Sequence, residues 1–108
     1  MKDDRLYLLH IRECLDRITR YASMGRETFF ADTMLQDAIL RNLQILAEST
    51  MRLSETLKRS RPEIDWRSIT GFRNVVVHGY LGIDLDQIWD IVERDLPPLR
   101  QTIEALLR

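Results

Sequence analysis

The sequence has few of the residues that interrupt or cross-link a chain. It contains four glycines, three prolines and one cysteine, Cys14, among 108 residues. Scarce glycine and proline argue against a turn-rich β fold and favour long helices. A lone cysteine can form no internal disulfide. Because no base stands beside Cys14 in the sequence, we expect it to be a small buried apolar side chain and not a nucleophile.

Long apolar runs and an excess of one charge are also missing. No run of about 18 apolar residues occurs, so we expect no transmembrane helix. The first residues lack the apolar segment of a secretory signal. We therefore expect a cytoplasmic protein with no membrane partner. The 16 basic and 17 acidic residues give a formal net charge of −1, so the whole chain is not a polycation.

Metal-binding and phosphate-binding motifs are absent too. The two histidines, His10 and His78, belong to no Cys/His cluster and to no His-Glu-x-x-His motif, and no glycine-rich phosphate loop occurs. We expect no metal and no cofactor. His10 follows apolar Leu9, and we expect a surface or partly buried histidine there and not a ligand.

The spacing of apolar residues predicts an all-α fold, an antiparallel bundle of four to five helices in a single domain covering residues 1–108. Steps of three and four predict helices over about 4–24, 33–59 and 66–78, a fourth from about 84, and a last one after Pro97-Pro98. Gly25 and the segment Ser60-Arg61-Pro62 end the first two. The expected N-caps are Asp3 or Asp4, Asp32 or Thr33, Asp65, and Asp84 or Asp86.

The predicted helix over 33–59 is apolar on more than one stripe. Leu40, Ile45 and Ala47 widen its apolar surface beyond a single seam. A wide apolar face indicates burial on two sides, which favours packing of a second subunit. The alternative is a central core helix in a monomer. Trp66 and Trp89 could stack on nucleic-acid bases, but we expect both to pack in the core.

The stretch Arg73-Asn74-Val75-Val76-Val77-His78-Gly79-Tyr80 is the candidate functional segment. On a regular helix, Arg73 and His78 are about 140° apart around the axis and roughly 7.5 Å apart along it. They can converge if the helix ends near His78, as Gly79 favours, or if a second subunit places another pair opposite. Six basic and three acidic residues lie between Arg52 and Arg73. That suits a polyanionic ligand, although a solvated helix face explains such charge equally well.

These residue types suit cleavage of RNA without a metal. His78 can act as acid or base near neutral pH, Arg73 can grip a phosphate, and Asn74 can orient a ribose, a phosphate or the imidazole ring. Attack of a 2′-hydroxyl on the adjacent phosphate would leave a 2′,3′-cyclic phosphate. From spacing alone a structural alternative is the commoner case: Arg73 pairs with Asp84 or Asp86, and His78 caps its own helix.

The order of arginine, four residues, histidine, one residue and tyrosine at Arg73, His78 and Tyr80 resembles the signature of the HEPN superfamily. More narrowly, the chain resembles the HepT ribonuclease toxins, which are encoded beside the MntA nucleotidyltransferase antitoxin. The similarity extends to the opening residues 5–11 and to the closing segment 85–99 with its tryptophan and proline.

This resemblance implies a homodimer, or a higher assembly of dimers, with two Arg–His motifs facing across a shared cleft. It implies a metal-independent endoribonuclease acting on mRNA or tRNA, with Arg73 and His78 catalytic and Asn74 in support. Tyr80 would receive AMP from ATP through an MntA-like antitoxin, and the added bulk and negative charge would exclude RNA. The competing hypotheses are a non-catalytic helical module that binds a nucleotidyltransferase and a stand-alone nucleotide-binding protein.

Overall fold

The computed structural model describes residues 2–78 and 84–108; no side chain is described for Lys2 or for residues 75–78. Every regular element in these ranges is helical, which confirms the predicted all-α fold. The elements are α1 (Lys2–Ala22), α2 (Arg26–Ala31), α3 (Thr33–Met51), α4 (Glu55–Arg59), α5 (Trp66–His78), α6 (Leu85–Asp90), a π-helical turn η2 (Ile91–Asp95) and α7 (Leu96–Leu107).

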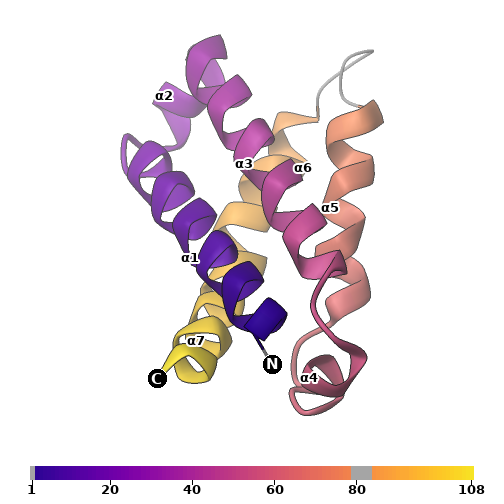
Figure 1. Cartoon of the computed structure of the whole chain (residues 1–108). Helices are drawn as coiled ribbons and strands as arrows, with labels where there is room; N and C mark the ends of the chain where they lie inside the picture. Colours follow the sequence, from indigo (N-terminus) through magenta and orange to yellow (C-terminus); the bar gives the residue numbers. More distant parts are fainter. Residues whose placement is uncertain (1, 79–83) are drawn as a thin grey trace.

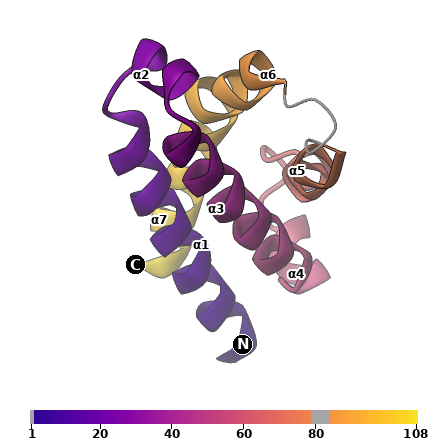
Figure 2. The ribbon, with the colours of Figure 1, turned by 90° about the horizontal axis from the view of Figure 1, so that it is seen from above.

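Helix α3 lies at the centre of the bundle. Helix α1 packs on one side of it and α5 on the other, while α7 packs against α1 (Figures 1 and 2). The core contains fully buried side chains from α1, α3, α6 and α7, such as Ile11, Leu43, Ile88 and Ile103. Helix α5 is therefore the outer member of the bundle, and its main neighbour is α3.

The wide apolar face of α3 is explained within one chain. Leu40 and Ala47 are buried and Ile45 is half-buried, and α1 and α5 of the same chain cover opposite sides of the helix. This is the arrangement of a central core helix, the alternative to burial by a second subunit. The predicted homodimer stays a prediction and needs support from another feature.

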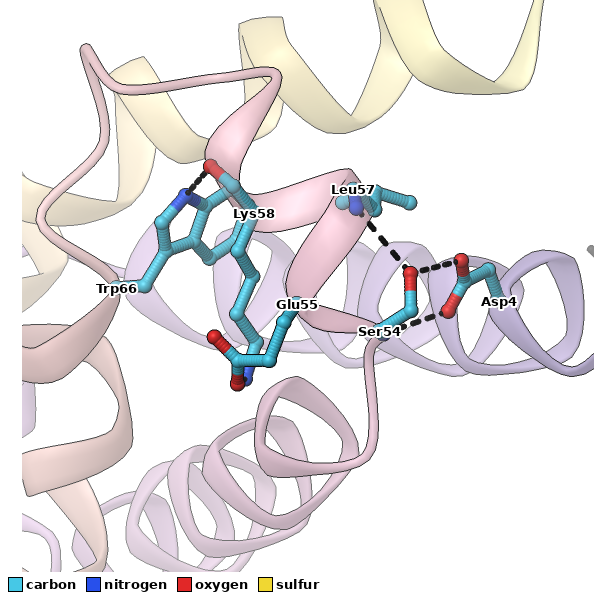
Figure 3. Close-up of polar contacts among 6 residues, drawn as sticks. All are labelled: Asp4, Ser54, Glu55, Leu57, Lys58 and Trp66. Carbon is cyan, nitrogen blue, oxygen red and sulfur yellow. Dashed lines mark hydrogen bonds and ion pairs between the residues drawn. The ribbon is translucent and has the colours of Figure 1, made fainter.

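The predicted helix over 33–59 is in fact two helices, α3 and α4. Ser54 caps α4 by accepting a hydrogen bond from the Leu57 amide at 3.2 Å. The Asp4 carboxylate accepts hydrogen bonds from the Ser54 amide at 2.8 Å and the Ser54 hydroxyl at 2.7 Å (Figure 3). Asp4 was expected to cap α1, but it lies inside that helix and holds a turn 50 residues away. Because Asp4 and Ser54 are 50 residues apart, no local sequence pattern could predict their contact.

Two further segments differ from expectation. Phe29 and Phe30, expected in a connection, belong to the short helix α2. Pro97 and Pro98, expected to interrupt the chain between helices, lie in the first turn of α7, directly after η2. Proline has no amide to donate, and both prolines follow a point where the regular i→i−4 bonding is interrupted, since the Leu96 amide bonds to the Ile91 carbonyl five residues earlier. The predicted caps at Asp32, Asp65 and Asp84 are confirmed, since each side chain accepts a backbone amide of the helix that follows.

The Asp4–Ser54 contact should give the fold a stability that depends on pH. Burial tends to raise the pKa of the Asp4 carboxyl, but the two Ser54 hydrogen bonds outweigh it, so the pKa is lowered from the usual 3.8. A carboxyl with a lower pKa in the folded state stabilises above the unfolded pKa, and that contribution is lost as pH falls through the folded pKa. We expect Asp4→Asn to cost about 1–3 kcal/mol of unfolding free energy at neutral pH.

Urea unfolding at neutral pH and at about pH 3 measures this, and the difference between wild type and Asp4→Asn should shrink at the lower pH. The control is Asp37→Asn, an exposed aspartate on α3, which should change stability by no more than about 0.5 kcal/mol. An equal loss at both pH values would show that the charge of Asp4 is irrelevant.

Candidate active site

Helix α5 is fixed at its first turn and along one side. The Asp65 carboxylate accepts from the Ser68 amide at 3.1 Å and so caps the helix. The Trp66 indole Nε1 donates to the Lys58 carbonyl at 3.0 Å, which ties α5 to α4 (Figure 3). It also donates to the Arg61 carbonyl, just beyond the end of α4, at 3.0 Å. Ile69 and Phe72 are buried in the core. The same geometry leaves Arg73 and Asn74 exposed.

A hollow of about 530 Å³ opens beside α5, and we call it the α4–α5 hollow. Its walls come from the end of α3, from α4 and from α5, and they consist of Met51, Glu55, Lys58, Trp66, Arg67, Thr70, Gly71, Arg73 and Asn74. Arg67, Thr70, Gly71 and Asn74 are spaced by three and four residues, so they form one stripe along α5.

A second hollow of about 320 Å³, the α3 hollow, is lined by Glu48, Met51, Arg52 and Arg73. Met51 and Arg73 line both hollows. The Arg73 Nη1 lies 3.8 Å from the Met51 sulfur. The exposed Arg73 guanidinium therefore stands between two adjoining depressions and can be reached from either of them.

The two hollows together carry more positive than negative charge. Their walls contain Arg52, Lys58, Arg67 and Arg73 against Glu48 and Glu55. One pair is partly compensated, because Lys58 Nζ lies 3.7 Å from a Glu55 carboxylate oxygen. Three of the other five basic residues in the segment 52–73 thus line the hollows together with Arg73, and this arrangement suits a polyanionic ligand.

The carboxylates proposed as structural partners of Arg73 are engaged elsewhere. Asp86 accepts from Arg26 Nη2 at 2.7 Å, and Asp84 caps α6 by accepting from the Gln87 amide at 3.1 Å. The structural alternative for Arg73 therefore lacks its expected partners in the described part of the chain. An exposed arginine surrounded by other cations is better suited to binding an anion from outside.

His78 is the last residue of α5 that the structure describes, because residues 79–83 lie outside the described ranges. Its side chain lies outside what the structure describes, as do Gly79 and Tyr80 entirely. The predicted convergence of Arg73 and His78 in one groove, and the modification of Tyr80, stay predictions. Asn74 lies one residue beyond Arg73 and lines the α4–α5 hollow.

The other reactive or aromatic residues have structural roles. Cys14 is 2% exposed, and burial raises the pKa of its thiol to about 11, so the prediction of an inert buried side chain is confirmed. Trp89 is buried with its ring centroid 5.3 Å from that of Phe29. Trp66 is partly buried against the core. His10 is exposed on α1.

No helix within 2–78 or 84–108 is long and apolar enough to span a membrane.

The individual contributions of Arg52, Lys58 and Arg67 to this site were not predicted from the sequence. The prediction of a polyanionic ligand rested only on the basic composition of their segment. A usable signal was present on α5, where Arg67, Thr70 and Asn74 follow a helical stripe that avoids the buried Ile69 and Phe72. The places of Arg52 and Lys58 could not be read in this way, because the turn after α3 depends on the distant Asp4.

Comparison with known proteins gives the site its chemical context. A probable ribonuclease HepT of Thermococcus cleftensis is 33% identical over 93% of this chain and 92% of its own length. The mRNA nuclease HepT of Shewanella oneidensis is 25% identical over 89% of this chain and 90% of its own. A Methanocaldococcus jannaschii protein, named as a gamma-glutamylcyclotransferase and predicted RNase, is 32% identical over 98% of this chain, which spans only 48% of that relative.

No solved structure gives a significant match to this chain. The sequence model of the family described as Ribonuclease HepT-like matches residues 11–106. That match runs from the middle of α1 into the last turn of α7 and includes the whole of α5. The resemblance seen in the sequence and the predicted ribonuclease class are confirmed: the chain belongs to the HepT-like ribonuclease family.

Proposed function

We propose that this chain is the toxic component of a toxin–antitoxin system, a metal-independent endoribonuclease that cuts mRNA or tRNA. Arg73 and His78 are the catalytic residues and Asn74 supports them. The observation that carries the proposal is the position of Arg73, exposed between two basic hollows on the helix that also contains His78. Membership of a ribonuclease family supplies the substrate class.

The reaction follows from these two side chains. His78 takes the proton of a ribose 2′-hydroxyl while the 2′-oxygen attacks the adjacent phosphorus. The new bond from the 2′-oxygen replaces the bond to the 5′-oxygen, which takes a proton from water as it leaves. Arg73 stabilises the negative charge that develops on the phosphoryl oxygens, because its guanidinium can donate two hydrogen bonds at once. The products are a 2′,3′-cyclic phosphate and a 5′-hydroxyl.

A homodimer completes this site. Positions 73 and 78 are about 140° apart around an ideal straight helix, and such a helix does not present them on a single face. A two-fold partner that packs against α5 would place a second Arg–His pair opposite the first. Helix α5 suits that role, because it is the outer helix of the bundle.

Regulation of the toxin belongs to the same proposal. An MntA-like nucleotidyltransferase adds AMP from ATP to Tyr80, two residues beyond His78. The added phosphate brings negative charge and bulk to a site built to hold phosphate, so RNA is excluded. Mass spectrometry of the chain co-expressed with its antitoxin should find AMP on Tyr80 and none on Tyr80→Phe. An unmodified Tyr80 in the neutralised complex would refute this part.

The activity is tested with the purified chain and a labelled RNA in the presence of EDTA. The proposal expects cleavage, with a 2′,3′-cyclic phosphate on the upstream fragment. Digestion of that fragment by a cyclic phosphodiesterase confirms the end group. Cleavage that disappears with EDTA and returns with Mg²⁺, or that leaves a 5′-phosphate on the downstream fragment, contradicts it.

A further inference from the structure

We propose that the α4–α5 hollow is a phosphate subsite for single-stranded RNA, next to the phosphate that is cut. Arg67 and Lys58 hold the backbone of a flanking nucleotide there, while Arg73 holds the scissile phosphate. This inference rests on the proposed function. It adds a path for the strand, which leaves Arg73 along α5 toward the first turn of that helix.

The stripe along α5 gives the path its direction. Arg67, Thr70 and Asn74 present a cation, a hydroxyl and an amide to the hollow, and all three groups can donate hydrogen bonds to phosphate or ribose oxygens. Arg67 precedes Arg73 by six residues, which is about 9 Å along a helix. Two cations at such a separation can contact different phosphates of one strand.

Gly71 leaves a gap in the middle of this stripe. Apart from the adjoining residues and the backbone of its own helix, no described atom would lie within 4 Å of a Cβ placed on Gly71, so the space above it is open. A glycine inside a helix costs roughly 1 kcal/mol relative to alanine. An approaching ribose-phosphate backbone accounts for keeping the position free of a side chain.

The second cation of the α4–α5 hollow, Lys58, is held in place on the wall that α4 forms. The Lys58 side chain runs beside the Trp66 indole and ends at the Glu55 carboxylate, 3.7 Å away (Figure 3). It is only 14% exposed, so its ammonium is held at the wall and does not sweep through solvent. The Trp66 N–H is already donated to two carbonyls and cannot bond to a base edge. The Trp66 N–H therefore contributes no recognition of base sequence in the hollow.

The test measures binding without cleavage, using a fluorescent single-stranded RNA in which every ribose is 2′-O-methylated. Fluorescence anisotropy gives the Kd over a series of salt concentrations. Arg67→Ala should weaken binding by roughly five- to twentyfold and reduce the slope of log Kd against log salt by about 0.7, the value for one phosphate contact on a single strand. Gly71→Leu should also weaken binding by filling the gap, although leucine favours a helix.

The matched controls lie on the far side of α3. Arg20→Ala on α1 removes an exposed arginine, and Gln101→Leu on α7 adds an apolar side chain at an exposed position. Both should leave the Kd and its salt slope unchanged. Circular dichroism and thermal unfolding of each variant establish that the helices persist.

Kinetics separates this inference from the proposed function. With cleavable RNA, Arg67→Ala should raise KM while kcat changes little, because the contact is made in the ground state and the transition state alike. Wild-type Kd, salt slope and KM in both Arg67→Ala and Gly71→Leu would overturn the subsite and leave the ribonuclease intact. Loss of self-association with unchanged RNA binding would likewise overturn it and assign the hollow to a protein interface.

Discussion

Arg73→Ala is expected to lower the rate of RNA cleavage by roughly 10²–10³-fold without unfolding the chain. Arg73 is exposed. Within residues 2–78 and 84–108, its guanidinium donates a hydrogen bond only to the Met51 sulfur. Its removal should therefore change the unfolding free energy by no more than about 0.5 kcal/mol. Arg73→Lys should recover only part of the rate, because a lysine cannot donate a bidentate pair of hydrogen bonds.

Cleavage assays beside urea unfolding decide between the catalytic and structural hypotheses for this residue. His78→Ala should lose roughly 10²–10⁴-fold in rate and should also lose the limb of the pH–rate profile that belongs to the imidazole. In cells, neither variant should inhibit growth. A fully active Arg73→Ala, or one that is inactive only because it unfolds, would reject the catalytic assignment.

Phe72→Ala is expected to cost about 3–5 kcal/mol of unfolding free energy, a large part of the total stability of a small domain. Phe72 is 4% exposed and precedes Arg73 directly on α5. Because α5 packs mainly against α3, the loss of this aromatic ring removes a principal attachment of the helix that carries the site. We therefore expect cleavage to fall together with stability, unlike in Arg73→Ala.

Urea denaturation followed by circular dichroism measures the loss, and Phe72→Leu provides a conservative control that should cost less than about 1.5 kcal/mol. If Phe72→Ala unfolds near the wild-type midpoint, α5 is held chiefly by the Trp66 hydrogen bonds to the end of α4. In that case the double variant Phe72→Ala/Trp66→Phe should lose more unfolding free energy than Phe72→Ala alone.

Helix boundaries that depend on neighbouring residues could be predicted from the sequence. Asp32, Asp65 and Asp84 each bond to an amide two or three residues later, so the signal and the contact lie in the same short segment. The break after Met51 could not be predicted, because the Asp4 carboxylate that stabilises it comes from the other end of the chain.

The candidate site likewise has features that the local sequence predicts and features that depend on long-range contacts. By itself, the sequence determined the helical fold, the family and the order of arginine, histidine and tyrosine along one segment, because these depend on residue type and on short, regular spacing. Only the tertiary structure decided that Arg52, Lys58 and Arg67 gather around Arg73. Their meeting depends on the turn between α3 and α4 and on the packing of α5 against α3, which are contacts between residues far apart in the chain.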